Sequence, residues 1–237
     1  MNAPDVVYPL VRKSQYEELR YSLRSLENVP HGRVFIAGAK PDWLSDAVIH
    51  IPVEKIAGET RYQNAEKNWR NALSHPDLAE EFIAMNDDFF IMQPMRTIPY
   101  YHDGELAKYV EYREQLGDTH ENYLNGMRRT IQALQRFHVK TPLGYTLHIP
   151  MLMNKYKRLA ISSMFRDQID AGEIMLMRTL YGNLFDVGGE QHIDVKYYND
   201  NFDETLPFLS SNDPAFKYER LGDFIRAKFP VKSEYEI

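Results

Sequence analysis

The sequence predicts an α/β fold in which a mostly parallel sheet is flanked by helices. Short apolar runs alternate with amphipathic segments over the first hundred residues, a pattern typical of parallel sheets covered on both faces. The chain has 237 residues and 43% hydrophobic content, enough for a substantial buried core. We expect one domain over 1–237, with a sheet-rich half (1–99) and a helical elaboration (100–237).

Four apolar runs of the first half are predicted as strands, at 5–11, 33–39, 48–53 and 81–92. A helix is expected at 14–28, where apolar residues recur at helical spacing behind a Ser14 cap. A second helix is expected at 61–73; its apolar face is formed by Tyr62, Ala65, Trp69 and Leu73.

The pattern changes beyond Pro99. Helical spacing predicts helices at 105–116, 120–137 and 172–185, and β-rich runs predict strands at 146–153 and 195–200. No Pro-, Gly- or Ser-rich linker separates the two halves. The second half is therefore expected to extend the same domain.

Composition excludes several classes of protein. The formal charge is −6, so no global basic field points to nucleic acid, and the absence of cysteine excludes disulfides and thiolate metal sites. No segment approaches about 18 uninterrupted apolar residues. We expect a soluble, cytoplasmic protein without a membrane span.

The run at 81–92 contains Asn86-Asp87-Asp88 between two apolar stretches. Ionised carboxylates in such a run are costly unless a positive group meets them. The pair lies where the fourth strand is expected to end, and open α/β sheets bind ligands outside the carboxyl ends of their strands. Because Mg²⁺ and Mn²⁺ prefer carboxylate oxygens, we predict that Asp87 and Asp88 hold such a metal. Alternatively, one Asp caps a turn and the other is solvated.

Several segments carry a resemblance to a known family. They are DVVYPLV, ELRYSLRSLEN followed by RVFIAGAKPDWL, FIAMNDDFFIMQP, HIPMLMNKYK and FPVKSEYE. The sequence resembles the Stealth-type sugar-phosphate transferases and the related capsular-polysaccharide glycosyltransferases with a GT-A-like fold. The family's first region usually continues into an Asp-Gly-Ser-Asp type turn, whereas this chain reads Arg12-Lys13-Ser14-Gln15.

The resemblance implies a nucleotide-sugar donor and Mn²⁺ or Mg²⁺ as cofactor. We expect the half over 1–99 to bind the nucleotide sugar and the half over 100–237 to form the acceptor side. Asp87 and Asp88 match the carboxylates for the metal and the diphosphate, and Asp88 is also a catalytic candidate. Asp5 is a donor-binding candidate or a strand-edge residue. Asn68 is a further donor-binding candidate, on a face of its helix that is otherwise expected to be solvated.

Three candidates come from the second half. His148 matches the family's His-x-Pro segment and is either a catalytic base for the acceptor hydroxyl, a diphosphate ligand or a satisfied core residue. Arg178 is a donor-binding candidate because a guanidinium can clamp a leaving diphosphate. Asn183 is a candidate in the same segment.

We therefore expect a metal-dependent glycosyltransferase that moves a sugar from a nucleotide sugar to an acceptor hydroxyl. One alternative is transfer of a sugar 1-phosphate. Another is a phage-type enzyme that glycosylates hydroxymethylated bases in DNA, and a third is a non-catalytic relative that binds a sugar nucleotide or glycan. The DNA alternative would give a purpose to two basic clusters, which comprise Arg128, Arg129, Arg136 and Lys140, and Lys155, Lys157 and Arg158.

Overall fold

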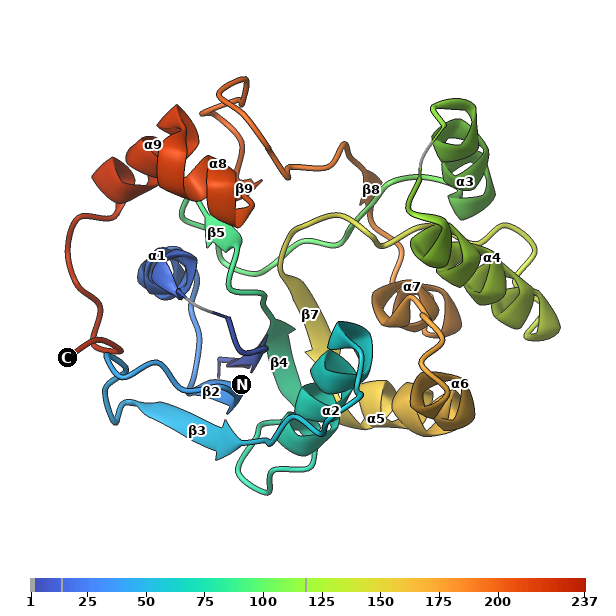
Figure 1. Ribbon diagram of the computed structural model, residues 1–237, viewed down its shortest axis with the longest axis horizontal. Helices are drawn as coiled ribbons and strands as arrows, with labels where there is room; N and C mark the ends of the chain where they lie inside the picture. Colours follow the sequence, from blue (N-terminus) through green and yellow to red (C-terminus); the bar gives the residue numbers. More distant parts are fainter. Residues whose placement is uncertain (1–2, 14, 118) are drawn as a thin grey trace.

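The computed structural model describes residues 3–13, 15–117 and 119–237. At its centre is a five-stranded sheet in the order β3-β2-β1-β4-β7 (Figure 1). These strands are β1 (Asp5–Leu10), β2 (Val34–Gly38), β3 (Val48–Pro52), β4 (Glu81–Ala84) and β7 (Met151–Asn154). The first four are parallel, and β7 is an antiparallel edge strand beside β4. The predicted mostly parallel sheet flanked by helices is confirmed.

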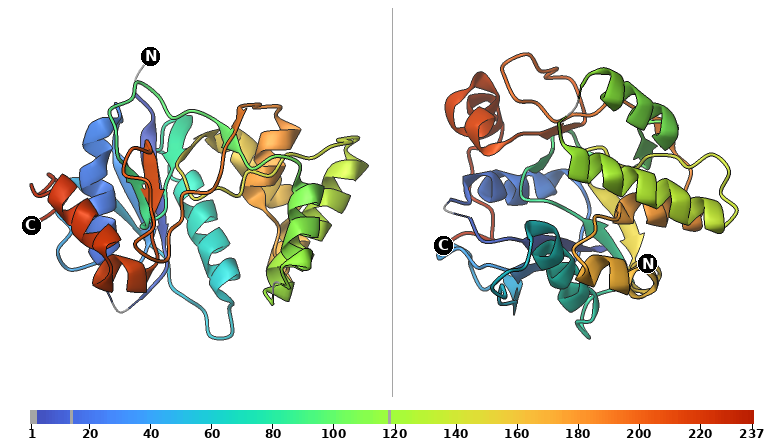
Figure 2. Two further views of the ribbon diagram at one scale, coloured as in Figure 1. Left: turned by 90° about the horizontal axis from the view of Figure 1, so that it is seen from above. Right: turned by 45° about the vertical axis from the view of Figure 1, so that its right-hand side comes forward.

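Alternate side chains of the central strand β1 serve two cores. Val6 and Tyr8 pack in the same cluster as Leu19 and Leu23 of α1 (Glu17–Ser25). Val7 packs instead with residues of α2 (Arg61–Leu73). Figure 2 shows α1 and α2 on opposite sides of the sheet. This alternation follows from the period of two along a strand.

The second half adds helices on both sides. Those on the α2 side are α3 (Leu106–Gln115), α4 (Glu121–Arg136), α5 (Lys155–Met164), α6 (Arg166–Asp170) and α7 (Met177–Leu184) (Figure 2). On the α1 side lie α8 (Asp213–Tyr218) and α9 (Arg220–Lys228), and the ring of Phe216 in α8 packs 5.6 Å from that of Tyr21. Across the described residues, no helix combines the length and apolarity needed to cross a membrane.

The short elements complete the order. A 3-10 helix, η1 (Leu26–Asn28), extends α1, and two small ladders pair β5 (Phe89–Ile91) with β9 (Phe208–Ser210) and β6 (Tyr101–His102) with β8 (Glu190–Gln191). The helix expected at 14–28 thus ends in a 3-10 turn, and its predicted cap, Ser14, lies outside the described residues.

Three of the element predictions are wrong in extent. The run 81–92 is two strands, β4 and β5, because the Asn-Asp-Asp turn separates them and β5 pairs with β9 instead of the central sheet. The strand expected at 146–153 begins only at Met151, after Pro150, which cannot donate to a ladder. The helix expected at 172–185 starts at Met177, after a turn in which Gly172 has a φ of 79°.

A fourth prediction, the strand at 195–200, is wrong: only Lys196 forms an isolated bridge, to Ser210. The remaining expected helices, at 61–73, 105–116 and 120–137, agree closely with α2, α3 and α4.

Two buried serines of α1 fix the segment that follows the Asp pair. The hydroxyl of Ser22 donates to the carbonyl of Phe89 at 2.6 Å, and the backbone N–H of Ile91 donates to the hydroxyl of Ser25 at 3.1 Å. Both serines belong to the LRYSLRSL motif. The motif therefore positions the loop after β4 by holding β5 against α1.

Candidate active site

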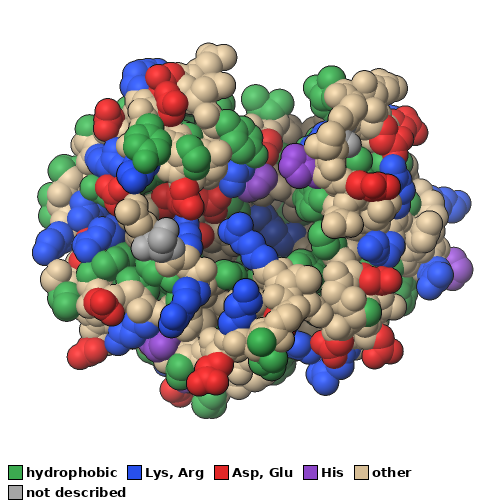
Figure 3. Space-filling model, viewed as in Figure 1, with side chains coloured by type: hydrophobic (Ala, Val, Ile, Leu, Met, Phe, Trp, Pro, Cys, Tyr) green, Lys and Arg blue, Asp and Glu red, His purple; other side chains and the backbone are tan. Residues whose placement is uncertain are grey.

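The site forms where the carboxyl ends of β1 and β4 meet at one edge of the sheet. From β1 the chain crosses to β2 on one side, while β4 lies on the other side of β1, which is the arrangement that opens a crevice in doubly wound sheets. Met151 of β7 pairs with Ala84, so the loop before β7 reaches the same edge. Figure 3 shows a hollow near the centre of this face, with basic side chains in its floor and histidines beside it.

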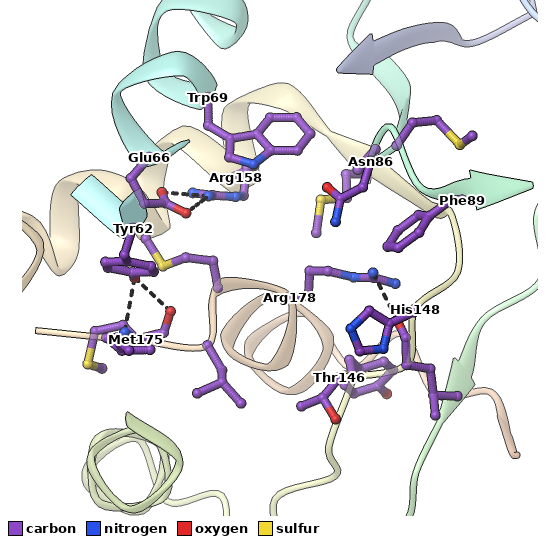
Figure 4. A pocket seen from close by; sticks show the side chains of 18 of the residues that line it. Tyr62, Glu66, Trp69, Asn86, Phe89, Thr146, His148, Arg158, Met175 and Arg178 are labelled. Carbon is purple, nitrogen blue, oxygen red and sulfur yellow. Dashed lines mark hydrogen bonds and ion pairs between the residues drawn. The ribbon is translucent and has the colours of Figure 1, made fainter. Parts of the chain in front are cut away.

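A pocket of about 360 Å³ lies at this edge. Its walls are largely apolar, with the aromatic side chains of Tyr62, Trp69, Phe89, Tyr123 and Tyr145. The polar groups that line it include Asn86, Thr146, His148 and Arg178 (Figure 4). A mainly apolar cavity with a few convergent polar groups is the usual form of a small-molecule site.

His148 is held by Asp194, a residue of the loop after β8. Nδ1 of His148 lies 2.7 Å from Oδ2 of Asp194, and the backbone N–H of His148 donates to Oδ1 at 2.8 Å. With its side chain 35% exposed, His148 is not a core residue, which removes one of its three predicted roles. When Nδ1–H donates to a carboxylate, the neutral ring keeps its free lone pair on Nε2, so the contact prepares His148 to accept a proton.

The charge of Asp194 supports that arrangement. Burial acts to raise the pKa of this carboxyl, but hydrogen bonds from the side chain and backbone of His148 and from the backbone of Val195 together lower it below its usual value. Asp194 therefore stays ionised around neutral pH and can accept the hydrogen bond from Nδ1–H of His148.

Arg178, from the first turn of α7, lines the same pocket. Its Nη1 donates to the carbonyl of Leu147 at 3.1 Å, while its buried Nε has no hydrogen-bond partner in the described parts of the chain. Burial lowers the pKa of Arg178 to about 10, so the guanidinium is still charged at neutral pH. A half-buried guanidinium with an N–H group that has no partner suits an anionic ligand.

Asp87 and Asp88 each pair with a lysine. Nζ of Lys13, in the loop after β1, lies 2.7 Å from Oδ2 of Asp87, and Nζ of Lys196 lies 2.7 Å from Oδ2 of Asp88. The hydroxyl of Ser210 also lies 3.4 Å from Oδ2 of Asp88. The positive groups that a partly buried carboxylate pair needs are thus provided by the chain itself.

These residues do not fit a divalent metal. Lys13 contacts Glu18 at 3.0 Å and Asp213 at 2.9 Å in addition to Asp87, so its ammonium lies among the carboxylates on which a metal would depend. Within the ranges that the structure describes, no three or more His, Asp or Glu side chains are arranged to hold a metal ion. The metal at Asp87 and Asp88 stays a prediction from the sequence, without support from the arrangement of donors.

Two other residues predicted to bind the nucleotide-sugar donor lie outside the pocket. Asp5 is at the start of β1, the opposite end from the site, and accepts from the backbone N–H groups of Arg33 and Ala79, both at 2.8 Å, as expected for the strand-edge alternative. The side-chain oxygen and nitrogen of Asn183 are both hydrogen-bonded to backbone, and Oδ1 accepts from the N–H of Leu143 at 2.9 Å. Neither residue lines the pocket.

Asn68 is buried instead of solvated, which corrects the expectation for its face of α2. Its Nδ2 donates to the carbonyl of Leu10 at the end of β1, at 3.1 Å, and its buried Oδ1 has no hydrogen-bond partner among the described residues. Asn68 thus holds the end of β1 through this hydrogen bond, and its contact with the nucleotide-sugar donor stays a prediction.

Three arginines of the two basic clusters form ion pairs. Arg128 pairs with Glu114, and Arg129 lies 3.6 Å from Glu173. Arg158 is buried and forms a bidentate contact with Glu66, with Nη2 at 2.9 and 2.7 Å from its two oxygens. These arginines do not form one open basic surface.

Five residues of the site have no place among the sequence predictions: Lys13, Glu18, Asp194, Lys196 and Asp213. Lys13 stands out in the sequence only as a departure from the family's turn. A signal for Asp213 is the polar run Ser-Ser-Asn-Asp directly after the apolar run at 206–209. No local pattern marks Asp194 or Lys196, because each is defined by a partner distant in the sequence.

Comparison with known proteins adds relatives at modest identity. The exopolysaccharide phosphotransferase CpsY of Mycobacterium leprae is 24% identical over 273 residues, which cover 95% of this chain and 50% of the relative. A capsular polysaccharide phosphotransferase of Neisseria meningitidis serogroup B is 26% identical over 180 residues, which cover 68% of this chain and 47% of the relative. The predicted resemblance is confirmed.

A third relative agrees with these two. The capsular polysaccharide phosphotransferase of Haemophilus influenzae is 27% identical over 180 residues, covering 68% of this chain and 49% of the relative. No family model matches the chain. The chain spans about half the length of these curated relatives, so the similarity concerns only a part of each of them.

Proposed function

We propose that this protein transfers a sugar 1-phosphate from a nucleotide-sugar donor to a hydroxyl of a glycan. The observation that carries the proposal is the pair of His148, oriented by Asp194 at 2.7 Å, and Arg178 in one pocket at the carboxyl edge of the sheet. The names of the relatives, all capsular or exopolysaccharide phosphotransferases, favour phosphate transfer over the sugar transfer that the sequence alone suggested. A cytoplasmic location stays a prediction.

In the proposed reaction, the acceptor oxygen attacks the phosphorus that bears the sugar. The bond from that phosphorus to the bridging oxygen breaks, and a nucleoside monophosphate leaves with the electron pair. Nε2 of His148 takes the proton of the acceptor hydroxyl, and Asp194 stabilises the resulting imidazolium. Arg178 stabilises the charge on the phosphoryl oxygens, and the aromatic walls pack against the sugar ring.

The leaving group separates the two kinds of transfer. In an assay of a panel of nucleotide sugars with capsular oligosaccharides, we expect nucleoside monophosphate and a new phosphodiester signal in the ³¹P NMR spectrum. Release of nucleoside diphosphate would instead show sugar transfer, by attack at the anomeric carbon. Donor binding without any turnover would favour the non-catalytic alternative, which the oriented His148 argues against.

The choice between a glycan acceptor and a DNA acceptor can be tested at the basic clusters. We expect turnover to change little with salt, and the Arg128→Glu, Arg129→Glu double variant to retain it, because both arginines already pair with carboxylates. A DNA acceptor predicts the opposite: binding falls steeply as salt rises, since phosphate contacts release counterions, and charge reversal weakens it further. Filter binding of hydroxymethylated DNA at several salt concentrations distinguishes these outcomes, with the melting temperature confirming that the variant is folded.

A further inference from the structure

We propose that the ammonium group of Lys13 occupies the cation position of the acidic loop after β4, so that the protein binds its donor without a divalent metal. This inference deepens the proposed function and rests on it where donor binding is concerned. Nζ of Lys13 lies 2.7 Å from Asp87, 2.9 Å from Asp213 and 3.0 Å from Glu18. An ammonium has three N–H donors, and three carboxylates are within reach of them.

The carboxylates around Lys13 come from three separate elements. Glu18 is in the first turn of α1, Asp87 follows β4, and Asp213 begins α8. Glu18 is only 4% exposed and also accepts from the hydroxyl of Ser211 at 2.6 Å. Because a buried carboxylate without a counterion is strongly destabilising, Glu18 depends on a cation, and the side chain of Lys13 supplies it.

Lys196 forms a similar ion pair with the neighbouring carboxylate, that of Asp88. Its side chain and that of Asp88 are 15% and 16% exposed, and the two are in direct contact at 2.7 Å. Both members of the Asp pair are therefore compensated by lysines from other segments. A metal that bound Oδ2 of either aspartate would have to displace an ammonium group from a contact of 2.7 Å.

These ion pairs reduce the negative charge of the acidic loop beside the pocket in which we propose that the nucleotide sugar binds. Lys13 contacts Asp87 and Lys196 contacts Asp88, both at 2.7 Å, so each carboxylate charge is offset by an ammonium group. The positive charge for the phosphates of the nucleotide sugar then comes from Arg178, whose Nε–H has no hydrogen-bond partner among the described residues.

The decisive measurement needs no enzyme activity. Mn²⁺ is titrated into the full chain and the free ion is followed by electron paramagnetic resonance. We expect no bound Mn²⁺ at millimolar concentration. Binding by the wild type that disappears in Asp87→Asn would overturn the proposal.

Two further measurements examine the role of the lysine. The Lys13→Met variant leaves three carboxylates without their cation, and we expect Mn²⁺ to raise its melting temperature but not that of the wild type. Lys228→Met, at the exposed end of α9, is the matched control and should behave as wild type. If Lys13→Met does not fold, the wild-type titration still decides.

Transfer activity provides the second arm. Turnover in EDTA should equal turnover in Mn²⁺, and activity that is lost in EDTA and restored by Mn²⁺ would contradict the inference. Should no donor be turned over under any condition, the proposed function fails while the Mn²⁺ titration still tests the role of Lys13. The two failures are thus distinguishable.

Discussion

Replacing His148 by Asn is expected to lower turnover by about 10²–10⁴-fold, the range for loss of a positioned proton acceptor, with little change in melting temperature. The side chain is 35% exposed and its one charged partner, Asp194, is also accessible to solvent at 39%. Asn keeps a hydrogen-bonding group toward Asp194 but has no basic nitrogen. Donor affinity should persist, since Arg178 is unchanged.

The measurement combines melting temperature, donor affinity and turnover on the same preparation. Asp194→Asn should also reduce turnover, because its amide can hold the imidazole in the tautomer without a free lone pair on Nε2 and no longer stabilises the protonated form. His138→Asn is the matched control, as His138 is exposed and has a φ of 62° that Asn tolerates. A destabilised His148→Asn protein with near-normal turnover would remove His148 from the chemistry.

The second large effect is expected at Arg178. In Arg178→Met, turnover should fall by about 10²–10³-fold, as for loss of one preorganised donor to a developing negative charge. The melting temperature should stay level or rise, because a partly desolvated cation is replaced by an apolar side chain of similar length. A gain in stability together with a loss of activity is not expected for a residue whose role is structural.

Arg158 in the wall of the same pocket gives the matched contrast. Its contact with Glu66 is bidentate and its side chain is only 3% exposed, so Arg158→Met leaves a buried carboxylate without a partner. That variant should lose about 3–5 kcal/mol of stability. Thermal melting of the two variants beside the wild type tests the contrast. If Arg178→Met were destabilised to the same degree and remained active, the assignment of Arg178 as a phosphate ligand would be wrong.

Local patterns in the sequence were sufficient for much of the fold. The helix α2 has an apolar stripe with a period close to 3.6, and each parallel strand is a short apolar run, so neither depends on distant partners. The division of 81–92 into β4 and β5 was not predictable in this way. Both strands are apolar, and what separates them is the pairing of β5 with β9, more than a hundred residues later.

The candidate site was predictable for the residues with an unusual local setting. His148 and the Asp pair stood out in otherwise apolar runs, although the partners of the pair did not. The structure brings His148 and Arg178 together in one pocket, and the roles of these residues stay predictions. Asp5 and Asn68 show the limit of such reasoning, because each is hydrogen-bonded to the backbone of a segment distant in the sequence. A lone acidic or basic residue in the sequence carries no sign of which opposite charge it will meet.

The contact of Lys13 with Asp213 joins residues 200 positions apart. A pairing of that span forms only after a large loop has closed, and native contacts of this kind are associated with slow folding. Partly folded chains would therefore hold Asp213 apart from Lys13, with the contacts of Lys13 to Glu18 and Asp87 able to form first. During refolding, formation of the sheet should precede the assembly of this ionic cluster, so transfer activity should return later than the secondary-structure signal.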